Sequence, residues 1–327
     1  MTRHTTVEQA GEAGTIAAIR SAAPSSINGD DAAVLDSTAS NSRQVCSTDI
    51  LVRGRHFRFR YSSPFEVGVK AVSQNFADIQ AMGGRPTALL LAIATPGDME
   101  LETISELARG IHSAAAPFGA ELVGGDVVRS KDLVISLTAL GELGGPAAAL
   151  TLDGAGVGHQ VIATGPIGYS AAGLCILEHF GSRKSVPQDD HILQKLVSWH
   201  CAPELEPGRG TVARAAGASS MTDNSDGLVA DLSVIAQRSG VSIDLNPEAL
   251  APDEMLLHAA ERTGVDPWKW VLTGGEDHTL VGTTDSRLPA NYRPIGMVRR
   301  LADDDPNAAF VTVGGEKPAY TKGWQSL

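Results

Sequence analysis

Apolar segments of strand length alternate with longer amphipathic segments along this chain. Residues 88–94 (ALLLAIA), 133–140 (LVISLTAL) and 160–164 (QVIAT) are short and rich in aliphatic side chains, as expected of buried strands. Segments 64–82 and 101–116 instead repeat their apolar residues at the spacing of an amphipathic helix. An alternation of this kind predicts an α/β or α+β fold.

The second half of the chain continues the pattern after a change of composition. Segment 140–156 is rich in Gly, Ala and Pro and has no amphipathic period, so we take it as a domain junction that separates residues 1–145 from 146–327. Beyond it, a helix is expected from Ser170, and Asp226 is expected to cap a helix that ends at Gly240.

Charge and cysteine content restrict the class of function. The 26 basic and 38 acidic residues give a net charge of −12, which opposes binding to nucleic acid and to anionic membranes. Cys46, Cys175 and Cys201 are far apart and form no CxxC pair, so they are expected to be reduced thiols. The N-terminus lacks the apolar core of a signal peptide and no apolar run is long enough to span a bilayer, so a cytoplasmic protein is expected.

Carboxylates recur where strands are expected to give way to turns. These places are Asp30-Asp31, Ser47-Thr48-Asp49, Gly124-Gly125-Asp126 and Asp223-Asn224-Ser225-Asp226. Two carboxylates held ~4 Å apart repel by about 4 kcal/mol at an effective dielectric constant of about 20. The neighbouring carboxylates of Asp30 and Asp31 are therefore either solvated in a loop or neutralised by a cation.

Asp78 is unusual because it lies on a helical stripe that is otherwise small and apolar. Its neighbours at helical spacing are Ala71, Asn75 and Met82. A carboxylate in such a place is costly to bury unless a cation pairs with it, and the alternative is a helix edge exposed to water.

Oxygen donors from Asp, Ser and Thr, without a His or Cys cluster, favour Mg²⁺ over Zn²⁺ or copper. Because Mg²⁺ usually borrows phosphate oxygens, a nucleotide is the expected companion. The chain has no GxxxxGK[ST], no HRD or DFG kinase set and no GxGxxG. A nucleotide is therefore expected to be held mainly through bridging metal ions.

Taken in order, these motifs resemble the thiamine-monophosphate kinase family, part of the aminoimidazole ribonucleotide synthetase superfamily. The matching stretches are GDDAAVL (29–35), STDILVRGRHF (47–57), KAVSQNFADIQAMGGRPTALLLAIATP (70–96), AELVGGDVVRS (120–130), TDNSDGLVADL (222–232), LTGGEDHTL (272–280) and KGW (322–324). The resemblance implies a two-domain fold, with an N-terminal sheet domain (1–145) that binds ATP and Mg²⁺ and pairs in a homodimer, and a C-terminal α/β domain (146–327) that completes the substrate site. It implies direct transfer of the γ-phosphoryl group of ATP to thiamine monophosphate, with several Mg²⁺ ions and no covalent nucleophile.

The resemblance also implies roles for individual residues. Metal ligands would be Asp30, Ser47, Thr48, Asp49, Asp78, Asp126, Asp223 and Asp226. Gly125, Asp126 and Ser225 would contact the nucleotide, and His56, Glu276 and Trp324 would contact thiamine monophosphate.

Three departures separate the chain from the family pattern. An arginine that contacts ATP in the family is replaced by Leu152, and an aspartate in the same run is replaced by His159. Two threonines after Asp126 are replaced by valines. The loop after Asp49 carries four arginines (Arg53, Arg55, Arg58 and Arg60), which either form a solvated segment or recover the positive charge lost at position 152.

Two other functions stay open from the sequence alone. One is an ATP-dependent enzyme that phosphorylates or activates another small substrate. The other is a nucleotide-binding module without catalysis, which the retained aspartates disfavour because repelling carboxylates have no use without a metal ion.

Overall fold

The computed structural model describes residues 5–28, 32–37, 40–301 and 310–323, and the chain divides into two compact units. Unit 1 comprises residues 1–79 and 85–146, and unit 2 comprises residues 80–84 and 147–327. The boundary at residue 146 lies inside the Gly-, Ala- and Pro-rich segment 140–156. Within the described residues, no helix has the length and hydropathy needed to cross a membrane.

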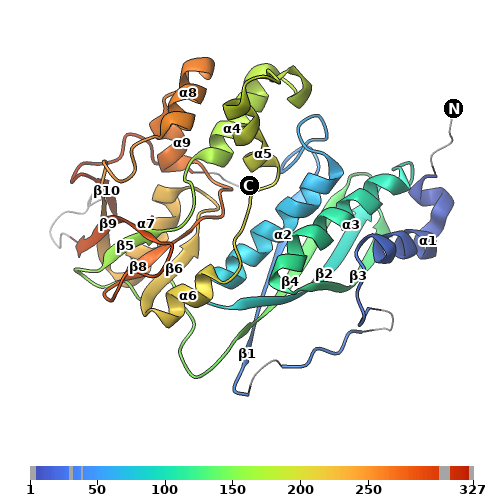
Figure 1. Cartoon of the computed structure of the whole chain (residues 1–327), viewed down its shortest axis with the longest axis horizontal. Helices are drawn as coiled ribbons and strands as arrows, with labels where there is room; N and C mark the ends of the chain where they lie inside the picture. The colour runs from blue at the N-terminus through green and yellow to red at the C-terminus, as the bar shows by residue number, and fades with distance from the viewer. Residues whose placement is uncertain (1–4, 29–31, 38–39, 302–309, 324–327) are drawn as a thin grey trace. The chain divides into compact units, whose positions relative to one another are not determined.

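Unit 1 is a four-stranded sheet with helices across one face (Figure 1). The strand order is β1-β4-β2-β3, with β2 and β3 parallel and the other neighbours antiparallel. The elements are α1 (Val7–Ala22), β1 (Arg43–Val52), α2 (Pro64–Ala81), β2 (Arg85–Thr95), α3 (Leu101–Ala115), η1 (Ala116–Phe118), β3 (Glu121–Arg129) and β4 (Val134–Leu143). The predicted helices and strands of this half are thus confirmed.

Glycine allows the layers of unit 1 to approach closely. A Cβ atom on Gly68 of α2 would lie 2.1 Å from the carbonyl oxygen of Leu107, so α2 and α3 pack backbone against backbone. A Cβ atom on Gly141 of β4 would lie 2.4 Å from the side chain of Ile79 of α2. These contacts seat the helices on the covered face of the sheet.

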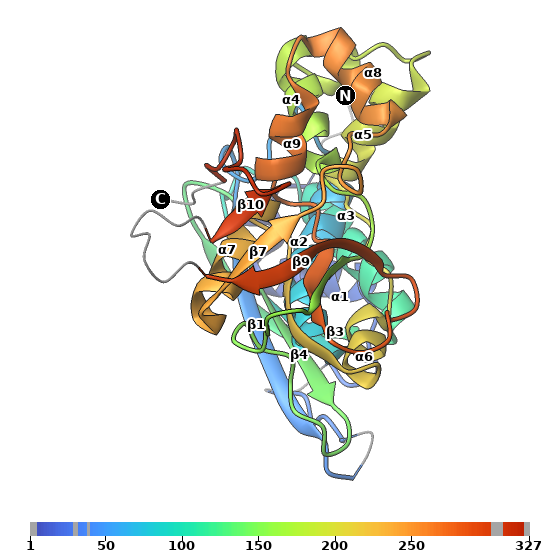
Figure 2. The same ribbon diagram turned by 90° about the vertical axis from the view of Figure 1, so that its left-hand side faces the viewer.

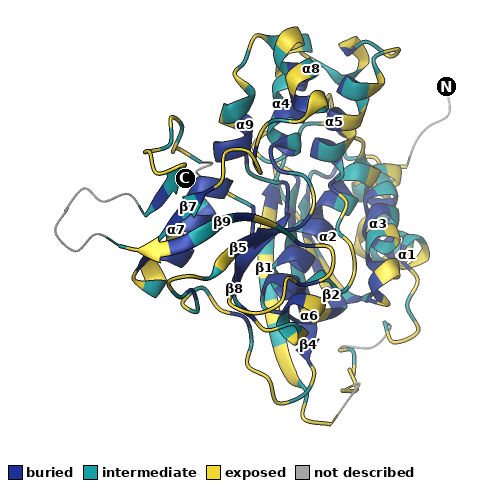
Figure 3. Ribbon diagram, turned by 60° about the vertical axis from the view of Figure 1, so that its left-hand side comes forward, coloured by how far each residue is buried: buried dark blue, intermediate teal, exposed yellow. Residues whose placement is uncertain are grey.

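The opposite face of this sheet is open, and two predicted positions need correction. Alternation along β1 leaves Ile50 53% exposed, while Leu51 is buried on the helix side (Figure 3). Asp49 lies inside β1 and Asp126 lies inside β3, so the prediction that both follow a strand end is wrong. The physical reason is that an edge strand accepts a carboxylate without ending: Asp49 is half-buried on the edge strand β1, and Asp126 is exposed on the edge strand β3.

Unit 2 contains a six-stranded sheet of order β10-β7-β9-β5-β8-β6, parallel only between β10 and β7. Its elements are β5 (Gln160–Ala163), α4 (Tyr169–Phe180), η2 (Arg183–Ser185), α5 (His191–Cys201), α6 (Arg209–Ala215), β6 (Ala218–Asp223), α7 (Leu228–Ser239), β7 (Val241–Leu245), α8 (Glu254–Thr263), α9 (Pro267–Thr273), β8 (Leu280–Thr284), β9 (Arg293–Arg300) and β10 (Val311–Val313). Helices α4, α5, α8 and α9 pack on one another (Figure 2), whereas α6 packs on β6, and α7 packs on β6 and β7. With the two sheets and their helices, the predicted α/β class is confirmed.

Helix α7 ends as predicted but begins differently. Gly240 closes it in the left-handed conformation with φ 65°. Its N-cap is Gly227, not Asp226, and the carboxylate of Asp231 accepts the backbone N–H groups of Asp226 and Gly227. Because Asp231 satisfies these donors from inside the first turn, the side chain of Asp226 is not needed as a cap.

Candidate functional site

In unit 1, a hydrogen bond joins two of the predicted ligands across different elements. Ser47 Oγ of β1 donates to Asp78 Oδ2 of α2 over 2.5 Å. Ser47 pairs in register with Ala139, which is fully buried, so Ser47 lies on the covered face of the sheet. The structure therefore places Asp78 against the sheet, half-buried, and not on a solvated helix edge.

Asp49 shares the face of Ser47, but Thr48 points the other way. Two residues on from Ser47, Asp49 is half-buried, as expected from the alternation of a strand. Thr48 is exposed on the open face, where its hydroxyl donates to Leu137 O over 3.1 Å and accepts from Thr138 Oγ1 over 3.0 Å. The side chain of Thr48 is thus directed away from the Ser47–Asp78 pair.

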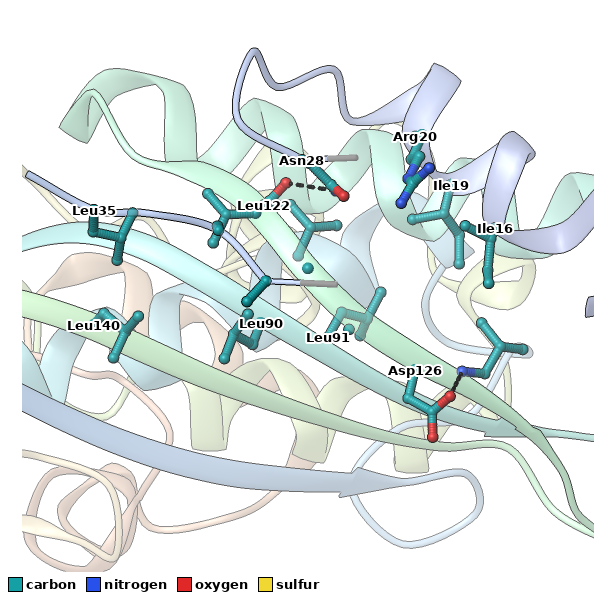
Figure 4. A pocket seen from close by; sticks show the side chains of 16 residues that line it. Ile16, Ile19, Arg20, Asn28, Leu35, Leu90, Leu91, Leu122, Asp126 and Leu140 are labelled. Carbon is teal, nitrogen blue, oxygen red and sulfur yellow. Dashed lines mark hydrogen bonds between the residues drawn. The ribbon is translucent and has the colours of Figure 1, made fainter. Parts of the chain in front are cut away.

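Asp126 lies beside a cavity of about 350 Å³ in unit 1 (Figure 4). Apolar side chains form most of its wall, including Ile19 of α1, Leu90 of β2 and Leu122 of β3. Asp126 is exposed, and its Oδ1 accepts the N–H of Val127 over 2.9 Å. The structure thus has an apolar pocket with a carboxylate at its edge.

Gly125, beside Asp126, is required by the backbone. It has φ 155°, and a Cβ atom there would lie 1.9 Å from the carbonyl oxygen of Leu91 on β2. The register of β2 and β3 shifts next to this point, between Leu89 and Leu90. Only glycine permits this approach, which fixes how the strand presents Asp126 to the cavity.

His56 is held by its own turn after β1. The N–H of Val52 donates to His56 Nδ1 over 3.0 Å. Because Nδ1 is the acceptor, the neutral imidazole carries its proton on Nε2, which makes Nε2 a donor for an anionic group.

In unit 2, three aspartates crowd the end of β6 and the start of α7. Burial raises the pKa of Asp231 to about 8, and the charges of Asp223 and Asp226 add to the shift. Partial burial and the charge of Asp223 also raise the pKa of Asp226. Asp223 is buried, and its Oδ2 lies 3.0 Å from His278 Nδ1. Like charges held together in this way favour a bound cation.

The loop Gly274–His278 runs beside these aspartates. Glu276 N donates to Ser225 O over 2.9 Å and His278 N donates to Asn224 O over 3.1 Å, so the structure brings Ser225 and Glu276 together. Both Glu276 and His278 have a positive φ (62° and 53°), a strained conformation that is common at binding loops.

Sequence reasoning missed Asp231 and Asp277. Asp277 is buried and accepts the N–H groups of Gly168 and Ser170 at the start of α4; burial raises its pKa to about 7. The signal that could have found them is their position in the sequence. Asp231 is an acidic residue five positions after Asp226, and Asp277 directly follows Glu276.

Mg²⁺ is the cation that the donor chemistry of these residues fits. Every predicted ligand offers oxygen, and two buried amides beside them have acceptors without a hydrogen bond among the described residues, Asn75 Oδ1 and Asn224 Oδ1. In the part of the chain that the structure describes, however, no three His, Cys, Asp or Glu residues form a ready-made metal cage. The residues therefore fit an ion whose coordination is completed by water and phosphate oxygens.

Two of the family departures lie in a loop that unit 2 holds firmly. Ser239 Oγ at the end of α7 donates to Leu152 O and accepts from Ala155 N. His159 Nδ1 accepts from Gly156 N and hydrogen-bonds Ser219 Oγ at 2.9 Å. The hydrogen bonds of His159 thus stabilise the loop, and Leu152 contributes no charge to it.

Two predicted site residues, Asp30 and Trp324, lie outside the described residues. The residue before Trp324 is described: Gly323 packs so closely on Asp226 that a Cβ atom would lie 2.2 Å from its carbonyl oxygen.

Comparison with known proteins gives consistent results. Residues 29–143 match the family model "AIR synthase related protein, N-terminal domain". The chain is 50% identical to the thiamine-monophosphate kinase of Corynebacterium glutamicum over 98% of this chain and 95% of that protein, and 42% identical to that of Mycobacterium tuberculosis over 91% and 85%. It is also similar to the crystal structure of thiamine monophosphate kinase from Aquifex aeolicus (TM-score 0.75, 30% identity, 95% and 98% covered). The structure of AaThiL complexed with AMPPCP and TMP matches with a TM-score of 0.75 and 30% identity, covering 98% of both chains.

Proposed function

The chain belongs to the thiamine-monophosphate kinase family, and from this premise we propose that its aspartates hold the Mg²⁺ ions that bring ATP and substrate together. The reaction is the ATP-dependent phosphorylation of thiamine monophosphate to thiamine diphosphate. The observation that carries the metal proposal is the group of Asp223, Asp226 and Asp231, where burial first and neighbouring negative charges second raise the pKa values of Asp226 and Asp231.

The ligands divide between the two units. In unit 1 we assign Asp78, oriented by Ser47, together with Asp49 and Asp126. In unit 2 we assign Asp223 and Asp226. Asp30 is assigned from the motif alone, and Thr48 contributes through its backbone carbonyl if it binds, because its hydroxyl is engaged with β4.

In phosphoryl transfer, the protein mainly positions the two reacting phosphate groups and neutralises their charge. Bound Mg²⁺ supplies the positive charge that lets ATP and a second phosphate approach each other. The carboxylates fix where that charge is held, and no side chain need act as a covalent nucleophile. We therefore propose direct in-line transfer assisted by several ions.

The apolar cavity beside Asp126 suits the nucleotide. Its walls of Leu90, Leu122 and Ile19 accept a flat base, and Gly125 lets the strand backbone approach the phosphates. Ser225 is assigned to the nucleotide as well. The analogue AMPPCP, bound to the related AaThiL, supports ATP as the co-substrate.

Three residues are assigned to thiamine monophosphate. His56 Nε2 is a donor for its phosphate, since Nδ1 is held by Val52. Glu276 and Trp324 suit the thiazolium cation and the aminopyrimidine, and Gly323 and Glu276 both pack beside the 225–226 backbone.

We further propose a homodimer in the cytoplasm, where ATP is supplied. The open face of the unit 1 sheet exposes Ile50 (53%) and Val128 (51%), apolar side chains that a second copy would cover. Sedimentation of the wild type and of Ile50→Lys tests the dimer: a dimer that becomes a monomer supports it, and a wild-type monomer refutes it.

The function is tested by incubating the protein with ATP, Mg²⁺ and thiamine monophosphate. Thiamine diphosphate and ADP should form in equal amounts, and neither should form when EDTA removes the metal. ADP without thiamine diphosphate would instead indicate a different acceptor.

A further inference from the structure

A second cavity, of about 560 Å³, opens in unit 2 beside the turn at residues 165–167. Its wall combines Tyr169 of α4, Lys195 and Trp199 of α5, and Arg293 at the start of β9. None of these residues is used by ATP, thiamine monophosphate or Mg²⁺ in the function proposed above.

Arg293 is the central feature of this cavity. Arg293 is half-buried, and this partial burial lowers the pKa of its guanidinium. It donates to the carbonyl oxygen of Gly165 over 2.5 Å, but no carboxylate among the described residues pairs with it. A partly buried cation that has no carboxylate partner favours an anionic ligand at this position.

The single carboxylate on the wall is already engaged. Asp253 Oδ2 accepts the hydroxyl of Tyr169 over 2.5 Å, and Asp253 Oδ1 accepts the N–H groups of Met255 and Leu256 at the start of α8. Lys195 adds a second positive charge, which has no ion-pair partner among the described residues. The lining therefore carries a net positive charge, and the carboxylate oxygens of Asp253 already accept hydrogen bonds from within the protein.

The remaining wall is apolar and aromatic. Ile167, Leu250, Leu256 and Val271 line it, and the rings of Tyr169 and Trp199 meet edge to face with centroids 6.0 Å apart. The indole N–H of Trp199 is buried and has no acceptor in the described part of the chain. A ligand here is thus offered apolar contact and donors.

From this geometry we propose that the cavity is a second ligand site, which binds a small organic anion with a flat apolar body. The anionic group lies at Arg293 and Lys195, and the body lies against Trp199, Leu250 and Val271.

The probe is 8-anilinonaphthalene-1-sulfonate, an aromatic anion whose fluorescence rises on binding, titrated into the intact protein. Arg293→Met and Lys195→Gln should each weaken the affinity of the tightest site at least about tenfold, because each removes a charge-assisted contact. Arg300→Met, which removes an exposed arginine at the far end of β9, is the matched control and should bind as the wild type does. The uncharged N-phenyl-1-naphthylamine should bind at least about tenfold more weakly than the sulfonate.

Saturating ATP, Mg²⁺ and thiamine monophosphate should leave the probe bound, and both variants should retain kinase activity. Displacement of the probe by either substrate would overturn the proposal, because the site would then be the substrate site. Unchanged affinity in Lys195→Gln, which alters an exposed side chain and so carries the test if Arg293→Met fails to fold, would overturn it too. Equal binding of the uncharged probe would show that no anion is recognised.

Discussion

Ser47 on β1 and Asp78 on α2 share a 2.5 Å hydrogen bond, which fixes a carboxylate of the helix against the covered face of the sheet. The contact links two stretches that are 31 residues apart in the sequence. It orients the carboxylate of Asp78, because one carboxylate oxygen accepts the hydroxyl while the residue stays half-exposed, and this orientation supports the proposal that Asp78 is a metal ligand.

Asp78→Asn should lower kcat by at least about a hundredfold while the melting temperature changes little. The substitution keeps the shape of the side chain and removes the charge that would hold the metal ion. Asp98→Asn, at an exposed turn position before α3, is the matched control and should have wild-type kcat. Near-normal turnover of Asp78→Asn at saturating Mg²⁺ would exclude Asp78 from the metal site.

Mg²⁺ and a nucleotide should raise the melting temperature together by more than the sum of their separate effects. The crowded carboxylates bind the ion better when phosphate oxygens complete its coordination. Differential scanning fluorimetry with Mg²⁺, with AMPPCP and with both checks this. Additive shifts would mean that ion and nucleotide occupy independent sites.

Without metal, Asp231→Asn should become increasingly more stable than the wild type as the pH rises from about 4 to about 8. The pKa of Asp231 is about 8 in the folded protein and lower in the unfolded chain. Its contribution to stability is therefore fully present below the unfolded pKa and is lost as the pH rises through the folded pKa. Thermal melts in EDTA at pH 5 and pH 8 check this, and a pH-independent difference between the proteins would contradict it.

Leu152→Arg should tighten ATP binding by about tenfold, because it restores a positive charge that the family pattern has at this position. Val157→Arg, at a 59% exposed position of the same loop, adds the same charge elsewhere and serves as the control. ATP titrations of the three proteins decide the matter. Equal affinities would show that the loss of the arginine is neutral here; a tighter Val157→Arg would show a general charge effect.

Trp324→Ala should raise KM for thiamine monophosphate about tenfold and leave KM for ATP unchanged. An indole face attracts the thiazolium by roughly 0.5–2 kcal/mol, and about 1.4 kcal/mol corresponds to one decade. Trp324→Phe should recover most of the loss. A variant that melts earlier but keeps both KM values would mean that Trp324 only closes the core.

The sequence predicted the regular elements well because periodicity reports burial directly. The run 88–94 lies within β2, and the expected amphipathic segment 64–82 buries Val72, Phe76 and Ile79 in unit 1. The motifs assigned Ser225 to the nucleotide and Glu276 to thiamine monophosphate, and the structure brings the backbones of these two residues together.

Other features depend on the fold and could not be read from the sequence. That Thr48 points away from Ser47 depends on which face of β1 the helices cover. Asp226 has the sequence signature of a cap. The carboxylate of Asp231, which lies in the first turn of α7, instead accepts the backbone N–H groups of Asp226 and Gly227. The cavity around Arg293 joins segments from five separate parts of unit 2, and such a juxtaposition leaves no local pattern.

The central claim is that the aspartates of both units hold Mg²⁺ beyond the ion that travels with ATP. The direct measurement is the initial rate of thiamine diphosphate formation as free Mg²⁺ is raised at fixed, saturating MgATP, for the wild type and for Asp223→Asn. We predict that the wild-type rate rises further with free Mg²⁺, and that the variant needs about tenfold more Mg²⁺ or fails to respond. A rate that depends on MgATP alone, with the same curve in both proteins, would contradict the account.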